Sequence, residues 1–412
     1  MADIMEAKKL IVKAGLRLLE TGLIARTWGN VSCRVSDTHF AITPSGRAYN
    51  TLTPDDIVLV KIDDLSYEGD IKPSSEKGVH AEVYKHRPDI NFVIHTHQLN
   101  ASMISVLRSD INFVPEKSAA IIGDHIPVSS YGLPSTKKLR DGVTETLKRS
   151  DSKAILLANH GAVCMGVDYE DAFKVAEELE KVCEDYVRRR FSLVTGKIAE
   201  TFESLNEYIA EKSALSAEKA KEIRPYNSER EGEFIKLSPV NGGDIIRVNT
   251  VTEKAVAPNS DYPPEIYLHL AVFNKRKDVN AIVHSKKPEI LAVSKCCKVL
   301  KPFLDDFAQI AGISARSAEF DPNDALKTSK KVVKKLKGRN SVLLKDNGML
   351  CVAGNNSDAQ AVEMVAEKNA KAYIASKLFG KNNVIAPHEA LLMRFIYKAK
   401  YSKKAQEGSN GK

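Results

Sequence analysis

Hydrophobic residues recur along the chain with two different periods, and each period predicts a different kind of element. Residues 4–19 place apolar side chains along one side of a helix, and residues 169–193 carry a longer stripe of the same spacing. Two short apolar runs with β-branched residues, IVLVKI within residues 54–63 and FVIHTHQ at residues 92–98, predict strands instead. The chain is therefore expected to alternate helices with strands.

The segments between these elements indicate how the strands are joined. KPSSEKGVHAEVYKHRP predicts a loop that opens a helix, with Ser74 and Ser75 where an N-cap would lie and Pro88 just past the helix end. KAILLANHGAVCMG, residues 153–166, predicts one further strand whose C-terminal edge carries His160. Several strands follow one another across short turns, so the pattern favours an α/β fold with a mixed, largely antiparallel sheet covered by helices.

The second half of the chain repeats the first. A shift of 189 residues places His95 on His284, and a shift of 187 residues places Gly161 on Gly348. Other pairs share these two offsets: Glu76 with Glu265, His80 with His269, Arg87 with Arg276, Asp89 with Asp278, Cys164 with Cys351, Asp171 with Asp358, and Tyr186 with Tyr373. Two nearly equal offsets indicate one duplicated domain with a net deletion of two residues.

This repeat predicts a division of the chain into four parts. A first α/β domain spans residues 1–196, and a helical and charged connection spans 197–232, with its helix over 206–223. A second α/β domain follows over residues 233–400. The polar segment 401–412 is expected to be a disordered tail.

Composition is that of a chain of ordinary globular domains. The 412 residues are 43% hydrophobic and 28% charged, and they suffice for two domains with their own cores. No segment approaches the roughly 18 uninterrupted apolar residues of a membrane helix. The amphipathic N-terminus, which carries acidic residues, resembles neither a secretory signal nor a transit peptide. The six cysteines form no C-x-x-C pair, so buried reduced thiols and a cytoplasmic location are expected.

The net charge of +8 is concentrated late in the chain, as in residues 327–339 and 397–404. Such clusters occur on surfaces that bind nucleic acid. The first cluster, however, has Val332, Val333 and Leu336 at helical spacing, which is typical of a solvated helix face. No aromatic-rich stacking platform accompanies it. We therefore expect neither a nucleic-acid partner nor a membrane partner.

The run FVIHTHQ carries the first candidate chemistry. His95 and His97 lie two residues apart, so both imidazoles project from one face of a strand. His160 ends another strand, and Glu76 opens a helix, where backbone N–H groups favour a carboxylate. Three imidazoles with an open fourth position form the pattern of a catalytic zinc site, beside which a carboxylate can act as base or fourth ligand. The alternative for His160 is a hydrogen-bonded turn histidine.

Small residues in three loops indicate a second kind of site. Glycine lets a ligand approach the backbone, while asparagine and serine offer uncharged hydrogen bonds to phosphate oxygens. The loops are Gly29-Asn30, Ser45-Gly46 and Ser74-Ser75. Each alone is an ordinary turn, but together and beside a metal site they predict a phosphate pocket. His80, His86 and His125 are interpreted as structural or exposed.

The second half lacks these features. Lys286 stands where the first half has His97, and Asn347 stands where it has His160. A lysine cation disfavours a divalent ion nearby. The PSSE stretch has also become YPPE, without either hydroxyl group. We therefore expect the second domain to keep the fold without the metal site.

The motifs GNVS-x-R, ITPSG, PSSE, HTH and NHG, in this order and spacing, resemble the class II aldolase/adducin family. The resemblance covers residues 1–195, and the second half resembles a degenerate copy. It implies two αβα domains, zinc bound by the three histidines, Glu76 as acid/base and the phosphate of a small sugar substrate held by the three loops. The implied activity is that of a zinc-dependent aldolase, a carbon–carbon lyase that cleaves or forms a bond of a phosphorylated ketose through a metal-stabilised enediolate.

Several alternatives remain open within this resemblance. Ribulose-phosphate 4-epimerases resemble this site but carry aspartate where Glu76 stands, which favours an aldolase here. An epimerase, dehydratase or decarboxylase on the same scaffold remains possible, as does a non-catalytic adducin-like scaffold protein. Three imidazoles and a carboxylate suit Zn²⁺, but Mn²⁺, Fe²⁺ and Co²⁺ are alternatives. Family aldolases assemble as rings, which implies a homo-oligomer, either a dimer or a tetramer.

Overall fold

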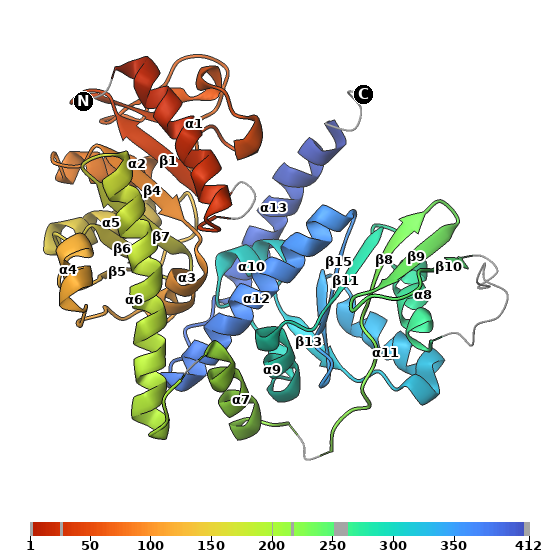
Figure 1. Ribbon diagram of the computed structural model, residues 1–412. Coiled ribbons are helices and arrows are strands. Elements are labelled where there is room, and N and C mark those ends of the chain that lie inside the picture. Colours follow the sequence, from red (N-terminus) through yellow and green to blue (C-terminus); the bar gives the residue numbers. More distant parts are fainter. Residues whose placement is uncertain (1–2, 25–27, 200, 216–217, 251–262, 408–412) are drawn as a thin grey trace. The chain divides into compact units, whose positions relative to one another are not determined.

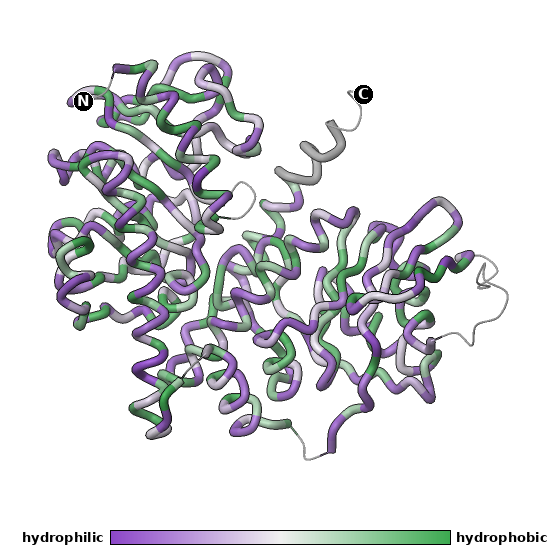
Figure 2. The backbone as a smooth tube through the Cα atoms, in the orientation of Figure 1, coloured by the Kyte–Doolittle hydropathy of each residue, from purple (hydrophilic) through white to green (hydrophobic). Residues whose placement is uncertain are grey.

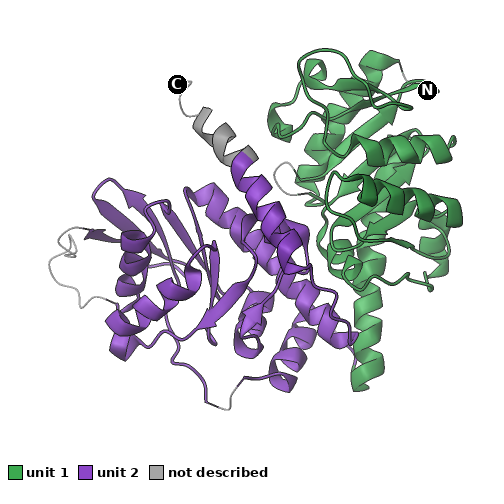
Figure 3. Ribbon diagram, turned by 180° about the vertical axis from the view of Figure 1, so that it is seen from behind, with its two compact units in different colours: residues 1–197 green, residues 198–412 purple. Residues whose placement is uncertain are grey.

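The computed structural model divides into two compact units, Met1–Lys197 and Ile198–Lys412 (Figures 1 and 3). It describes these residues, with side chains up to Ala399: 3–24, 28–199, 201–215, 218–250 and 263–407. Each unit contains one mixed sheet covered by helices. The fold class predicted from the sequence is therefore confirmed.

The first unit is built on a seven-stranded sheet in the order β3-β2-β1-β4-β7-β6-β5. Its strands are β1 (Asn30–Arg34), β2 (His39–Ile42), β3 (Val58–Lys61), β4 (Phe92–Thr96), β5 (Val128–Ser129), β6 (Ala154–Leu157) and β7 (Gly161–Gly166). Among these strands, β5 and β6 pair in parallel and the other neighbours pair antiparallel. The strand that carries His95, β4, lies between β1 and β7 in the middle of the sheet.

Helices cover both faces of this sheet. They are α1 (Ile4–Glu20), α2 (Lys77–His86), α3 (Leu99–Ser105), α4 (Glu116–Ile122), α5 (Lys137–Arg149) and α6 (Tyr169–Thr195), with short 3₁₀ turns η1 (Tyr49–Thr51) and η2 (Pro54–Asp56). Val93 of β4 packs in a core cluster with residues of α2 and α5. The preceding residue, Phe92, contacts Tyr169 of α6, with ring centroids 5.6 Å apart. Because successive side chains of a strand point to opposite faces, α2 and α5 cover one face and α6 the other.

The apolar run of β4 is thus explained by burial on both faces, which requires hydrophobic residues at every position. Along α6, by contrast, hydrophobic and hydrophilic residues follow one another at helical spacing (Figure 2). Most hydrophobic positions of α6 as far as Phe191 are buried, whereas Leu193 and Val194 near its end are exposed. The charged positions of α6 are half-buried or exposed. The predicted helices over 4–19 and 169–193 and the predicted strands at 54–63 and 92–98 are confirmed.

The second unit has an eight-stranded sheet in the order β10-β9-β8-β11-β15-β14-β13-β12. Its strands are β8 (Tyr226–Glu231), β9 (Phe234–Pro239), β10 (Ile246–Asn249), β11 (Ala281–Ser285), β12 (Val299–Leu300), β13 (Ala315–Ala318), β14 (Ser341–Leu344) and β15 (Met349–Ala353). The helices are α7 (Phe202–Lys212), α8 (Glu265–Lys275), α9 (Pro288–Cys296), α10 (Asp305–Ile310), η3 (Pro322–Asp324), α11 (Ala325–Leu336), α12 (Asn356–Leu378) and α13 (Pro387–Glu407). None of the helices described in either unit is long and apolar enough to cross a membrane.

The two units repeat the same elements at the predicted offsets. A shift of 189 carries β4 onto the bounds of β11, and a shift of 187 carries β6 onto the bounds of β14. The helix that follows the last strand, α6 or α12, also begins at residues related by 187. The duplication inferred from the sequence is therefore also a duplication of structure.

The structure corrects the prediction of a single strand over residues 153–166. Two antiparallel strands, β6 and β7, lie there, joined by a tight turn that contains His160. Asn159 in this turn has a φ of +61°, a conformation that asparagine tolerates better than most residues. The sequence Asn-His-Gly is therefore a turn signal that interrupts the apolar run.

Three other boundaries differ from the sequence prediction. The N-cap of α2 is Glu76, and Ser74 lies earlier, where its Oγ accepts a hydrogen bond from the Glu76 N–H (3.3 Å). In the connection predicted over 197–232, α7 ends at Lys212 rather than near residue 223, and β8 already belongs to the second sheet. The helix α13 runs to Glu407, into the predicted tail, and residues 408–412 of that tail lie outside the described residues.

Candidate metal and substrate site

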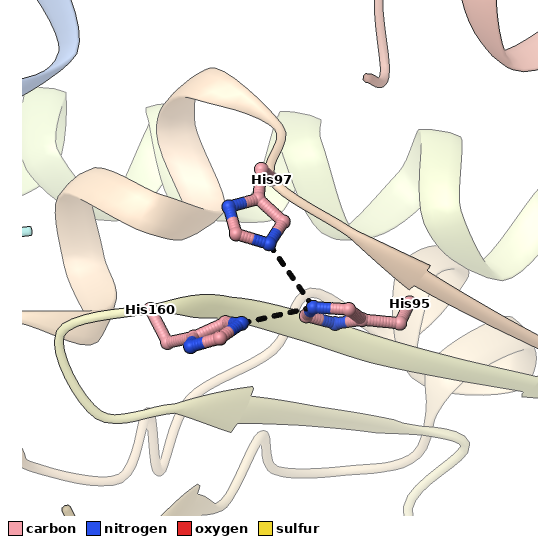
Figure 4. A group of neighbouring side chains, drawn as sticks. All are labelled: His95, His97 and His160. Carbon is pink, nitrogen blue, oxygen red and sulfur yellow. Dashed lines mark hydrogen bonds between the residues drawn. The ribbon is translucent and has the colours of Figure 1, made fainter. Parts of the chain in front are cut away.

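Three histidines converge at the centre of the first unit (Figure 4). His95 comes from β4, His97 follows the end of β4, and His160 comes from the turn between β6 and β7. The Nε2 atom of His95 lies 3.1 Å from Nε2 of His97 and 3.0 Å from Nε2 of His160. His95 and His160 are almost fully buried, and His97 is half-buried. The antiparallel pairing of β4 with β7 brings together residues 65 positions apart in the chain.

The tautomer of His95 follows from its backbone contact. Its Nδ1 lies 2.8 Å from the carbonyl oxygen of Ala162, and a carbonyl oxygen can only accept a hydrogen bond. Nδ1 therefore carries the proton and, in the neutral ring, Nε2 carries a lone pair. A hydrogen bond of this kind commonly fixes the ring orientation of a metal-ligating histidine.

That single lone pair faces more neighbours than it can satisfy. Besides His97 and His160, the Oε2 atom of Glu76 lies 3.1 Å from the same Nε2 of His95. One lone pair can accept one hydrogen bond, so the remaining close contacts would bring acceptors together without a proton between them. A cation at the centre turns these contacts into favourable ones. Nitrogen ligands of a tetrahedral zinc ion would lie roughly 3.3 Å apart, so the donor set and its spacing fit such an ion.

Glu76 lies at the start of α2, with its side chain only 10% exposed. Its Oε1 atom is 3.5 Å from Nε2 of His160. Burial alone would raise the pKa of the Glu76 carboxyl group, but electrostatic attraction to His160 and His95 outweighs burial and holds the pKa well below its usual range. The site therefore combines three imidazole side chains with one ionised carboxylate.

Asn30 and His80 extend this site into the core. The Nδ2 atom of Asn30 donates to Oε2 of Glu76 (3.3 Å), and its Oδ1 atom contacts Nε2 of His80. The sequence interpretation of His80 as merely structural or exposed missed this contact. The available signal was its spacing, because His80 lies four residues after Glu76 and therefore on the same side of α2. His86 and His125 lie elsewhere, beside Glu82 and Asp124 respectively.

The three loops of small residues meet beside Glu76. The Ser45 N–H donates to the Lys72 carbonyl oxygen (2.9 Å), and the Ser74 N–H donates to the Thr43 carbonyl oxygen (3.0 Å). The loops that carry Ser45-Gly46 and Ser74-Ser75 therefore run side by side. The Thr43 N–H in turn donates to the Val31 carbonyl oxygen (3.1 Å), next to the Gly29-Asn30 loop. The structure thus brings all three loops together.

Gly29 occupies a position that only glycine fits. Its φ is +100°, and a Cβ atom there would lie 2.6 Å from the carbonyl oxygen of His95. The Tyr49 hydroxyl group donates to the Gly29 carbonyl oxygen (2.9 Å) and fixes the loop. The loop is therefore packed directly on the backbone of the histidine strand.

Gly161→Ala is expected to disturb the histidine group through the backbone. A Cβ atom at position 161 would lie 2.2 Å from the Thr96 carbonyl oxygen, between His95 and His97. We expect the unfolding free energy to fall by about 1–3 kcal/mol, measured by denaturant unfolding, and metal affinity to fall with it. Gly348→Ala is the matched control, since its Cβ would lie 2.1 Å from the Ser285 carbonyl oxygen in the second unit. Unchanged metal affinity in Gly161→Ala would contradict this expectation.

The equivalent region of the second unit is arranged differently. His284 Nε2 donates to the Asn347 carbonyl oxygen (2.7 Å), and so carries a proton instead of a lone pair. The Lys286 ammonium group donates to the Ile223 carbonyl oxygen (2.8 Å). Within the described residues, the group found with metal-ligand geometry is that of His95, His97 and His160.

Comparison with known proteins places this geometry in context. A family profile described as "Class II Aldolase and Adducin N-terminal domain" matches two segments, residues 9–187 and 235–374. A 5-deoxy-D-ribulose 1-phosphate aldolase of Bacillus thuringiensis serovar kurstaki is 34% identical over 188 residues, which are 45% of this chain and 87% of the relative. An L-fuculose phosphate aldolase of Escherichia coli is 36% identical over 186 residues, 44% of this chain and 85% of the relative. A solved L-fuculose 1-phosphate aldolase matches with 30% identity and a TM-score of 0.43, over 50% of this chain and 95% of that one.

Proposed function

The chain belongs to the class II aldolase and adducin family, and on this premise we propose that its first unit is a metal-dependent aldolase acting on a phosphorylated ketose. The observation that carries the proposal is the convergence of three imidazole Nε2 atoms with the Glu76 carboxylate. The second support is similarity to relatives named as aldolases of sugar phosphates, at 34–36% identity.

We propose that His95, His97 and His160 hold a divalent cation, with zinc as the first candidate and manganese, iron or cobalt as alternatives. The bound cation supplies Lewis acidity toward the oxygen atoms beside the carbon–carbon bond that breaks. The protein keeps the ligands in place, since the backbone carbonyl of Ala162 orients His95. Burial of the histidines keeps bulk water away from the reacting atoms.

Glu76 is proposed to move the proton at the reacting carbon. In cleavage, the hydroxyl group of the fragment that becomes the aldehyde loses its proton as the carbon–carbon bond breaks. The electron pair of that bond stays on the carbon of the ketose fragment, and this carbon takes up a proton from Glu76, which has first gained one. In condensation, ionised Glu76 removes a proton from the same carbon. Its largely buried position beside His95 and His160 suits both steps, because the carboxylate touches the histidine group directly.

The phosphate group of the substrate is proposed to lie in the pocket formed by the three small-residue loops. The residues proposed to line it are Gly29, Asn30, Ser45, Gly46, Ser74 and Ser75. The side-by-side arrangement of these loops supports the proposal, as does their place next to Glu76. Asn30 connects the pocket with the carboxylate, because its amide donates to Glu76.

Ser75→Asp is expected to raise the KM for a phosphorylated ketose roughly tenfold or more, because a carboxylate would repel the phosphate dianion at short range. Ser75 is exposed, so the substitution leaves the core intact. Steady-state kinetics with Ser75→Ala as the control separates loss of the hydroxyl group from added charge. A KM for Ser75→Asp equal to that of the wild type would contradict the proposed phosphate pocket.

The experiment that tests the proposed function is a screen of ketose 1-phosphates with metal-replete protein. We expect release of dihydroxyacetone phosphate and an aldehyde, detected by coupled oxidation of a nicotinamide cofactor, and loss of this release after chelation. An epimerised sugar, a dehydrated product or released carbon dioxide would instead support an epimerase, a dehydratase or a decarboxylase. No turnover and no bound metal would support an adducin-like scaffold.

We propose further that the protein is a cytoplasmic homo-oligomer, a dimer or tetramer. Support for the location comes from its cysteines, since all six are free and buried. Support for assembly comes from the ring-forming aldolases that the chain resembles. Sedimentation velocity measures the mass in solution, and a monomer with full activity would contradict the proposed assembly.

A further inference from the structure

A buried chain of hydrogen bonds leads from the core to Glu76. Its members are Tyr84, Ser32, His80, Asn30 and Glu76. All of them except Glu76 are at most 5% exposed. The Tyr84 hydroxyl group lies 2.7 Å from Ser32 Oγ, and Ser32 Oγ lies 2.6 Å from His80 Nδ1. His80 Nε2 contacts Asn30 Oδ1, and Asn30 Nδ2 donates to Glu76 Oε2 at 3.3 Å.

The direction of each hydrogen bond follows from its last member. A carboxylate only accepts, so the amide of Asn30 must turn its Nδ2 group toward Glu76 and its Oδ1 atom toward His80. His80 Nε2 must therefore carry a proton. Burial and the nearby His95 lower the pKa of His80 to about 3, so the ring is neutral at physiological pH.

The same reasoning fixes the outer members. In a neutral His80 with a proton on Nε2, Nδ1 carries a lone pair, so the Ser32 hydroxyl group donates to it. Ser32 Oγ then accepts from the Tyr84 hydroxyl group. Every proton in this series of hydrogen bonds thus has one position. The orientation of the Asn30 amide is set by His80, Ser32 and Tyr84, which do not touch the site.

We propose that His80, held by Ser32 and Tyr84, is a positioning residue that orients the Asn30 amide so that it presents a donor to the Glu76 carboxylate. This inference rests on the proposed role of Glu76 as acid/base. Without the His80 donor, the Asn30 amide is free to rotate and place its oxygen against the carboxylate, which repels it. Glu76 would then lose both a hydrogen bond and its fixed position beside His95.

Comparison with the second unit distinguishes the proposed positioning role of His80 from a purely structural role. Ser228 Oγ lies 2.7 Å from His269 Nδ1, so the duplicate keeps the central pair of the chain. Ser228 lies opposite Ile282 in the sheet and Ser32 lies opposite Val93, and a shift of 189 relates Val93 to Ile282. The serine–histidine pair therefore belongs to the shared fold.

Two members of this hydrogen-bond network, the tyrosine and the asparagine, are absent from the second unit. Phe273 stands where the first unit has Tyr84, and Tyr226, two residues before Ser228, stands where it has Asn30. Nε2 of His269 has no hydrogen-bond partner among the described residues. Glu265 instead accepts from the Arg224 N–H (2.9 Å). The members that connect histidine to carboxylate thus occur in the unit that has the histidine group.

The kinetic test compares His80→Phe with His269→Phe in the full-length protein. We expect His80→Phe to lower kcat about 10- to 100-fold, the usual effect of removing a residue that orients a site residue, with KM changed less than about threefold. His269→Phe removes an equivalent buried imidazole and is expected to keep the wild-type kcat. Equal kcat values for wild type and His80→Phe, or equal losses in the two variants, would overturn the proposal.

Two further variants keep the test decisive if His80→Phe fails to fold. His80→Gln retains an amide donor toward Asn30 and is expected to recover most of the lost kcat. Tyr84→Phe removes only the outer hydroxyl group, and the duplicate already accommodates phenylalanine at this position. We expect kcat to fall less in Tyr84→Phe than in His80→Phe. A kcat for His80→Gln as low as that of His80→Phe would contradict the donor role.

A measurement independent of activity is the tautomer of His80, read from ¹⁵N-labelled imidazoles by NMR. We expect a proton on Nε2 and none on Nδ1 from pH 5 to 8, with the Nε2–H signal shifted in Asn30→Ala. A proton on Nδ1 would overturn the inference. Absence of turnover in the wild type would instead reject the proposed aldolase function, so the two failures are distinguishable.

Discussion

Glu76→Gln is expected to lower kcat by about 10²- to 10⁴-fold, the usual contribution of general acid–base catalysis. Glutamine has nearly the shape of glutamate and still accepts from Asn30, but it cannot gain or lose a proton at neutral pH. Bound metal is expected to stay near the wild-type level because the three histidines remain. Exchange of a carbon-bound proton of dihydroxyacetone phosphate with deuterated water, followed by NMR, measures this proton transfer alone.

Glu265→Gln in the second unit is the matched control. Glu265 occupies the equivalent position, but its carboxylate accepts from the Arg224 backbone, and the described residues of its unit contain no such group of three histidines. We expect wild-type exchange and cleavage rates for this variant. Rates for Glu76→Gln within about threefold of the wild type would reject Glu76 as the acid/base.

His97→Ala is expected to abolish metal binding and to lower kcat/KM by about 10³-fold or more. A divalent cation contributes several kcal/mol to stabilising charge in the transition state, and each 1.36 kcal/mol corresponds to tenfold in rate. Loss of one imidazole from a site with three protein ligands leaves two, which bind zinc weakly. Steady-state cleavage kinetics at fixed, buffered metal concentration provide the measurement.

His125→Ala is the control for this substitution, because His125 is partly exposed and pairs with Asp124 away from the site. It is expected to retain the wild-type kcat/KM and metal content. Full activity in His97→Ala under metal-free conditions would contradict a metal-dependent reaction.

Local hydrophobic patterns in the sequence predicted the main helices and strands, because each pattern reflects which side chains the fold buries. The stripe at residues 169–193 became α6, and the apolar run ending in His95 became the central strand β4. The apolar run over residues 153–166 was predicted as one strand, although it forms two. Both strands are buried on both faces, and such continuous burial removes the periodicity that would mark the turn between them. The Asn-His-Gly turn was the local signal of that break.

Prediction of the candidate site rested partly on residues that are close together in the sequence. The rest of the site is formed by strand pairing, which the sequence does not show directly. His95 and His97 are neighbours in the chain, so their proximity follows from any extended backbone. Their approach to His160 requires the register of β4 on β7, and the place of Asn30 opposite His95 requires β1 beside β4. Register is set by long-range packing, which explains why the Asn30–His80 contact was missed.

The duplicate shows which features the fold itself requires. The serine–histidine pair and the close packing of glycine on the histidine strand occur in both units, as at Gly161 and Gly348. The full set of three imidazoles does not, because Lys286 and Asn347 replace two of them. The third, His284, and Lys286 each donate a hydrogen bond to a backbone carbonyl group. Residues of the first unit that are replaced in the second, such as His97 by Lys286 and His160 by Asn347, therefore mark the chemistry that the two units do not share.

Elemental analysis of the metal-replete wild-type protein tests the central claim most directly. One metal centre formed by His95, His97 and His160 predicts about one divalent transition-metal ion per chain, with zinc as the expected element. About two ions per chain would mean that the second unit also binds metal, against the protonated Nε2 of His284. No bound metal would contradict the metal-dependent aldolase and leave the family's non-catalytic role as the better account.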